Sequence, residues 1–153
     1  MVERVVTSEY ERRMLIRLIE GQKRLPFTVN IIAGKHRSIE QNRLQRKWVA
    51  EIAEQIPGES AEYWRGYCKL RFGVPIMRRD SEAFRERYDK IIKPLPYEDK
   101  IAAMMEPLDL PVTRIMKTKQ KTEYLDEVFR HFTEQGVILT IPDDPALLGR
   151  RAA

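Results

Sequence analysis

The chain has 153 residues, of which 42% are hydrophobic and 33% charged, and its formal net charge is +5. This length suits one domain with a sizeable core, and the positive charge favours a polyanion or an acidic surface as partner. The single cysteine, Cys68, excludes an intrachain disulfide, and two histidines make a zinc site unexpected. Since the sequence shows neither a signal peptide nor the roughly 20 apolar residues of a membrane span, we expect a soluble cytoplasmic protein.

The first predicted elements are a helix and a strand. Thr7 or Ser8 suits the N-cap of a helix that runs to about Glu20, and Gly21 is typical of the residue that ends one. The β-branched residues of segment 27–32 predict a strand.

A basic stretch from Lys35 to Lys47 leads into the second helix. It contains five Lys and Arg residues and one acid. Ser38 suits the N-cap, and Gln41 would complete a capping box. The helix is predicted to continue to about Ile56, before a Pro-Gly pair.

The middle of the chain predicts three helices. The first spans residues 59–72, and Gly73 is expected to end it before an extended segment at 74–77. Helices are predicted at 81–93 and 97–105, separated by prolines.

A final helix from about Thr118 is predicted by apolar residues at i, i+3, i+4 and i+7, beginning at Leu125. Gly136 is typical of a left-handed C-cap, and residues 137–141 predict a strand that pairs with segment 27–32. The fold class expected is α+β, mainly helical, with one domain over residues 1–141 and a poorly ordered tail at 142–153.

Two basic clusters are the candidate site. Cationic side chains and free amides at a helix start favour phosphate binding, and cations at a helix N-terminus lower stability unless an anion is present. The alternative is an ordinary solvated helix face. The residues expected to contact DNA are Lys35, Arg37, Ser38, Asn42, Arg43, Arg46 and Lys47 in the first cluster, and Arg114, Lys117, Lys119 and Lys121 in the second.

Two motifs point to a family. The run Arg37-Ser38-Ile39-Glu40-Gln41-Asn42-Arg43 follows an apolar segment and precedes Trp48, and Thr133-Glu134-Gln135-Gly136-Val137 follows the last helix. Both resemble the phage NinB (lambda Orf-like) recombination protein family, and the order of elements agrees over residues 25–140. A tryptophan-containing C-terminal helix of that family is replaced here by a proline-broken tail.

The resemblance implies a non-catalytic homodimer that binds single-stranded DNA in a bacterial host cell. It also implies single-strand-binding protein and a recombinase as partners, and no membrane. Stacking of bases on aromatic rings is common in such proteins. Tyr63 and Tyr67 are the candidate exposed rings, whereas Trp64 and Phe72 share an apolar stripe.

Two other functions remain open from the residues alone. A Mg²⁺-dependent structure-specific endonuclease or resolvase needs converging carboxylates, but no tight acidic motif occurs. The available acids are Asp80, Asp89, Glu98, Asp99 and Asp109. A helix–turn–helix regulator would have to fit residues 97–135, which prolines interrupt. No Gly-rich phosphate loop is present, so we expect no nucleotide hydrolysis, and we expect no cofactor.

Overall fold

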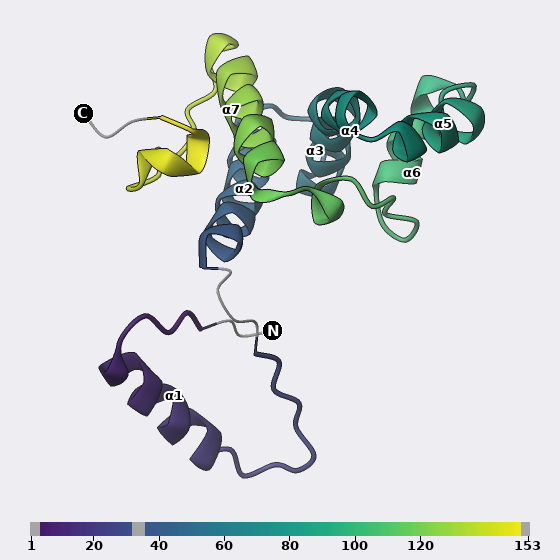
Figure 1. Ribbon diagram of the computed structural model, residues 1–153. Helices are drawn as coiled ribbons and strands as arrows, with labels where there is room; N and C mark the ends of the chain where they lie inside the picture. The colour runs from purple at the N-terminus through teal and green to yellow at the C-terminus, as the bar shows by residue number, and fades with distance from the viewer. Residues whose placement is uncertain (1–3, 32–35, 151–153) are drawn as a thin grey trace. The chain divides into compact units, whose positions relative to one another are not determined.

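The computed structural model describes residues 4–31 and 36–150, with the backbone alone for residues 36–38. Two units divide between His36 and Arg37, whereas one domain was expected over residues 1–141. Within the described ranges no β-strand occurs (Figure 1). The predicted α+β class, with a sheet formed by residues 27–32 and 137–141, is therefore wrong, and the fold is all-helical.

The N-terminal unit contains the helix α1 (Glu9–Glu20). Its prediction is confirmed: the Ser8 Oγ accepts a hydrogen bond from the Glu11 N–H at 3.1 Å, and Gly21 is the C-cap. None of the residues of α1 is buried.

The predicted strand at 27–32 belongs to the same unit, and Ile32 lies outside the described residues. Residues 27–31 have exposed side chains and no regular secondary structure. A strand satisfies its backbone groups by pairing with another strand, and the described part of this unit has a helix only.

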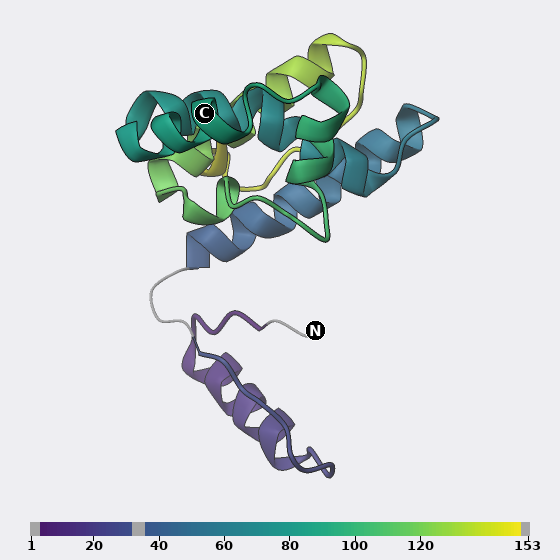
Figure 2. The same ribbon diagram turned by 90° about the vertical axis from the view of Figure 1, so that its right-hand side faces the viewer.

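In the second unit α2 and α7 lie side by side, α5 and α6 lie together at the other end, and α3 and α4 lie between these two pairs (Figure 1). Figure 2 shows α2, in blue, along one side of this unit. Its helices are α2 (His36–Gln55), α3 (Ala61–Cys68), α4 (Val74–Asp80), α5 (Glu82–Ile91), α6 (Tyr97–Met104) and α7 (Thr118–Glu134), with the shorter turns η1 (Lys69–Gly73), η2 (Thr113–Ile115) and η3 (Pro145–Leu148). None of the described helices combines the length and apolar character needed to cross a bilayer.

The helix predicted to end at Gly73 continues instead through a π-helical turn, η1, into α4. Gly73 serves packing, because a Cβ there would lie 2.7 Å from the Val112 Cγ1. The Val74 N–H bonds the Lys69 carbonyl, five residues back, and this wider turn precedes Pro75, which cannot donate to the regular ladder. The predicted extended segment at 74–77 is therefore wrong.

Two apolar clusters form the core of the second unit. The larger joins α2, α3, η1, α4 and α7 with the segment after α7 and η3, and the smaller joins α4, α5, α6 and the segment around Val112. Trp48, Ile52, Tyr124 and Leu125 are fully buried. The periodic apolar residues of α2 and α7 thus face one another, as amphipathic helices require.

Residues 137–141 alternate as the prediction of a strand requires, with Val137 and Leu139 buried and Ile138 78% exposed. Their neighbour is the helix α2. The Gln55 side chain donates to the Ile138 carbonyl at 2.7 Å and accepts from its N–H at 2.8 Å.

The same face of α2 continues this pairing one turn earlier. The Trp48 Nε1–H donates to the Thr140 carbonyl at 2.8 Å, and the Glu51 carboxylate accepts from the Thr140 N–H at 3.1 Å and from its hydroxyl at 2.8 Å. Side chains spaced three and four residues apart on α2 therefore take the place of a partner strand.

The end of α7 follows its prediction, since Gly136 has a positive φ of 86°. The tail from Pro142, expected to be poorly ordered, contains the turn η3, where the Asp144 carboxylate accepts from the Ala146 N–H at 2.9 Å. Leu147 and Leu148 of this turn belong to the larger core cluster.

Candidate nucleic-acid interface

A buried polar seam joins the N-terminal halves of α2 and α7. The Gln41 amide donates to the Thr122 Oγ1 at 2.9 Å, and the Gln45 Oε1 accepts from the Lys121 ammonium at 2.8 Å. The Gln45 amide also lies 3.4 Å from the Tyr124 hydroxyl. Because the seam fixes these two helix segments against each other, the two predicted basic clusters lie on adjoining helices.

The first cluster forms a stripe on the outer side of α2. Gln41 and Gln45 face α7. Positions 43, 46 and 47, which are spaced three and four residues apart, lie on the opposite side of the helix. Arg43, Arg46 and Lys47 are all exposed there. We call these three residues the α2 stripe. Asn42 is exposed at its edge.

The second cluster surrounds the start of α7. Arg114 lies in η2, and Arg114, Lys117 and Lys119 are exposed. The first turn of α7 carries no acid, and the Lys117 N–H donates to the Gln120 side chain at 2.8 Å. The missing acid leaves the positive end of the helix dipole uncompensated by its own first turn.

Lys119 has acidic neighbours. Hydrogen bonds from Arg79 and Gln120 lower the pKa of Asp80, and Lys119 adds a smaller effect of the same sign. The second cluster is therefore less purely cationic than the sequence indicated.

Lys121 differs from the other cations because it is 7% exposed and lies in the seam. Burial lowers the pKa of its ammonium to about 8. Its placement disfavours a direct phosphate contact. The sequence carried the signal, since Lys121 precedes Leu125, Val128 and Phe132 by helical spacings and so shares their apolar stripe.

The remaining predicted residues concern the start of α2. Lys35 lies outside the described residues, and of Arg37 and Ser38 the structure describes the backbone alone. Because α2 is already helical at His36, Ser38 is not at the N-cap. The capping box predicted with Gln41 is wrong, since that side chain belongs to the seam and also donates to the Leu147 carbonyl at 3.2 Å.

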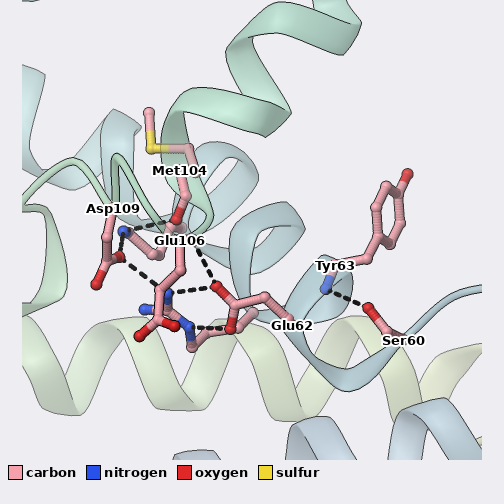
Figure 3. Close-up of polar contacts among 8 residues, drawn as sticks. Ser60, Glu62, Tyr63, Met104, Glu106 and Asp109 are labelled. Carbon is pink, nitrogen blue, oxygen red and sulfur yellow. Dashed lines mark hydrogen bonds and ion pairs between the residues drawn. The ribbon is translucent and has the colours of Figure 1, made fainter.

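A second charged group, which the sequence did not predict, ties residues 105–110 to α3 and η1 (Figure 3). The Asp109 carboxylate accepts from the Lys69 ammonium at 2.6 Å and from the Arg65 guanidinium at 2.9 Å. The Glu62 carboxylate accepts from Arg65 at 2.7 Å and from the Glu106 N–H at 2.9 Å.

The group is electrostatically balanced. Lys69 is only 2% exposed, and its ammonium also donates to the Met104 carbonyl at 2.9 Å. The bond from Lys69, followed by that from Arg65, lowers the pKa of Asp109, whereas burial lowers the pKa of Lys69. The network can position a loop whose Asp109 has a φ of 45°. The spacing of Arg65 and Lys69, four residues apart, was the signal in the sequence.

The acids considered for a nuclease have cationic neighbours in three cases. Asp80 pairs with Arg79 at 2.7 Å, Asp89 with Arg78 at 2.8 Å, and Asp109 with Lys69. Glu98 and Asp99 stand in the first turn of α6. Among the described side chains, those of residues 4–31 and 39–150, no three from His, Cys, Asp or Glu lie together as a metal site would require. Cys68 is a buried thiol whose pKa burial raises well above its usual value.

The aromatic residues considered for stacking are half-buried. Tyr63 and Tyr67 flank Trp64, each with its ring centroid 5.3 Å from that of the tryptophan. Tyr67 also contacts the His131 Nε2 through its hydroxyl at 3.3 Å.

Comparison with protein-family models, curated proteins and solved structures found no match for this chain.

Proposed function

We propose that this protein binds single-stranded DNA, without catalysis, through the α2 stripe and the exposed lysines at the start of α7. The observation that carries the proposal is the α2 stripe, because its three exposed cations share one face of a helix. The seam fixes the exposed lysines that lie about seventy residues later in sequence on the adjoining helix. A track of lysines and arginines neutralises successive phosphates and releases counterions.

Single-stranded rather than duplex DNA is proposed because of the resemblance of residues 37–43 and 133–137 to the NinB family. The same resemblance supports a role as recombination mediator, in which a homodimer helps a recombinase onto strands coated by single-strand-binding protein. Sedimentation of the purified protein tests the dimer. Recombinase loading on coated strands, measured with and without the protein, tests the mediator role.

The direct test is fluorescence anisotropy with a labelled single-stranded oligonucleotide at several salt concentrations. If about five phosphates are engaged, the slope of log K against log salt is near −3.5, taking roughly 0.7 per phosphate. Replacing Arg43, Arg46 and Lys47 together by alanine should make this slope shallower by about 2. The same oligonucleotide in duplex form should bind more weakly.

A matched control removes the same charge elsewhere. Arg85, Arg87 and Lys90 are exposed on α5, and their replacement by alanine should leave the salt slope unchanged. A salt-independent affinity, or an equal loss in the two triple variants, would contradict the proposal. Because all six side chains are exposed, both variants are expected to keep the fold.

A further inference from the structure

A recess between α3 and α6 is acidic, in contrast to the cationic α2 stripe. Its volume is about 400 Å³. It is lined by Glu59, Tyr63, Tyr97 and Glu98 and by the apolar residues Ile101, Ala102 and Met105. In a chain of net charge +5, this hollow is lined by two carboxylates and no basic residue.

The two carboxylates have no cationic partner in the described part of the chain, where neither Glu59 nor Glu98 forms an ion pair with lysine or arginine. Glu98 stands in the first turn of α6, and Glu59 precedes Ser60, the N-cap of α3. A helix N-terminus carries roughly half a positive charge against the full negative charge of each carboxylate. The recess therefore keeps a net negative charge.

The rings complete the site. Tyr97 is 55% exposed, and Tyr63 is half-buried. Burial raises the pKa of Tyr63, and the nearby Tyr97 and Glu59 raise it further, which is consistent with these three groups facing one another. Figure 3 shows the Tyr63 ring extending away from the Glu62 carboxylate, so it is not part of the Asp109 network.

We propose that this recess binds an arginine side chain, flanked by apolar residues, from a partner protein. A guanidinium stacks on tyrosine faces and donates to carboxylates in one plane. The apolar residues of the lining would contact the neighbouring side chains of the partner. A nucleic-acid strand is disfavoured here, because its phosphates would meet Glu59 and Glu98.

The test is a titration of the full-length ¹⁵N-labelled protein with the peptide acetyl-Gly-Leu-Arg-Leu-Gly-amide, followed by amide chemical shifts. The shifts are expected to concentrate at Glu98, Ile101 and Ala102, with a dissociation constant in the millimolar range. The same peptide with citrulline, the neutral isostere of arginine, should bind at least fivefold more weakly. Arginine amide alone should also bind at least fivefold more weakly, because it lacks the apolar contacts.

Two variants examine charge and ring separately. Replacing Glu59 and Glu98 together by glutamine should weaken peptide binding at least fivefold, and so should Tyr97→Leu. The matched control replaces Glu82 and Glu86 on α5, both exposed, by glutamine, and should bind the peptide as the parent does.

Equal binding of the citrulline peptide would overturn the proposal, as would equal binding of arginine amide or an equal loss in the control. Shifts of the same amides on addition of a single-stranded oligonucleotide would also overturn it, because the recess would then belong to a nucleic-acid site. Single-stranded DNA binding by the variant with Glu59 and Glu98 replaced should be at least as tight as that of the parent.

Discussion

The second unit buries two lysines whose hydrogen-bond partners differ in charge. One lysine is paired with a carboxylate, and the other bonds a neutral amide in the seam. Lys69 contacts a carboxylate, Asp109, at 2.6 Å, with Arg65 bound to the same oxygen. Lys121 contacts the neutral Gln45 amide at 2.8 Å and lies 5.9 Å from the Tyr124 ring centroid. Burial lowers the pKa of both ammonium groups, but only Lys69 has an opposite charge in contact.

This comparison shows that a buried lysine is tolerated for two physical reasons. An ion pair offsets the cost of removing both charges from water, provided that both partners remain. A lysine bound to a neutral amide instead shifts toward its uncharged form, which needs no counter-ion. The ion pair therefore stops stabilising the fold once either partner is removed, whereas the stability of the lysine–amide contact changes gradually with pH.

The largest expected effect follows removal of the charge on Asp109. The variant Asp109→Asn leaves Lys69 and Arg65 without that carboxylate and should lower the free energy of unfolding by roughly 3 kcal/mol or more. Urea denaturation monitored by circular dichroism measures it. Asp89→Asn, which removes the charge from the more exposed pair with Arg78, is the control and should cost much less, because solvent screens that pair. Similar losses in the two variants would remove the distinction.

A smaller loss is expected when Lys121 loses its neutral partner. Gln45→Leu removes the acceptor of the Lys121 ammonium and should cost roughly 1–2 kcal/mol at pH 7, since the lysine can release its proton. The same urea titration at pH 7 and pH 9 measures it, and the loss should shrink at the higher pH. A loss that grows with pH would contradict this account.

The smallest effect at pH 7 is expected for Lys121→Met, within about 1 kcal/mol of the parent, because a burial cost and a hydrogen bond are removed together. The pH dependence is more informative. The folded pKa is about 8 against roughly 10.4 for an unperturbed lysine, so between these values the unfolded chain binds more protons. Stability of the parent therefore rises with pH in that window, by roughly 1–3 kcal/mol, and the variant should lack this rise. Parallel stability curves for the two proteins would contradict the lowered pKa.

The helices were largely predictable because they depend on local signals. Ser8 and Gly21 mark the two ends of α1, and the apolar spacing beginning at Leu125 locates α7. Gly73 misled the prediction, because its missing side chain makes room for Val112 and does not end a helix. Local patterns report backbone preference and cannot report which distant side chain needs the space.

The candidate site was predictable in part. The exposed positions of Arg43, Arg46 and Lys47 agree with a solvent-facing stripe, whereas Lys121 is buried. A count of charges identifies a cationic segment, but only the phase of each lysine relative to the apolar stripe indicates which ones reach solvent. Contact with DNA stays a prediction for every residue of the two clusters.

The sequence by itself determined where helices form and which of their faces are apolar, because these follow from periodicity within a few turns. Only the tertiary structure decided what completes the extended segment at 137–141. Its alternation is equally compatible with a strand or with a helix face as neighbour, and the side chains of Trp48, Glu51 and Gln55 supply the hydrogen bonds. Backbone amides and carbonyls require partners of the right geometry, and a sequence does not state from which element those partners come.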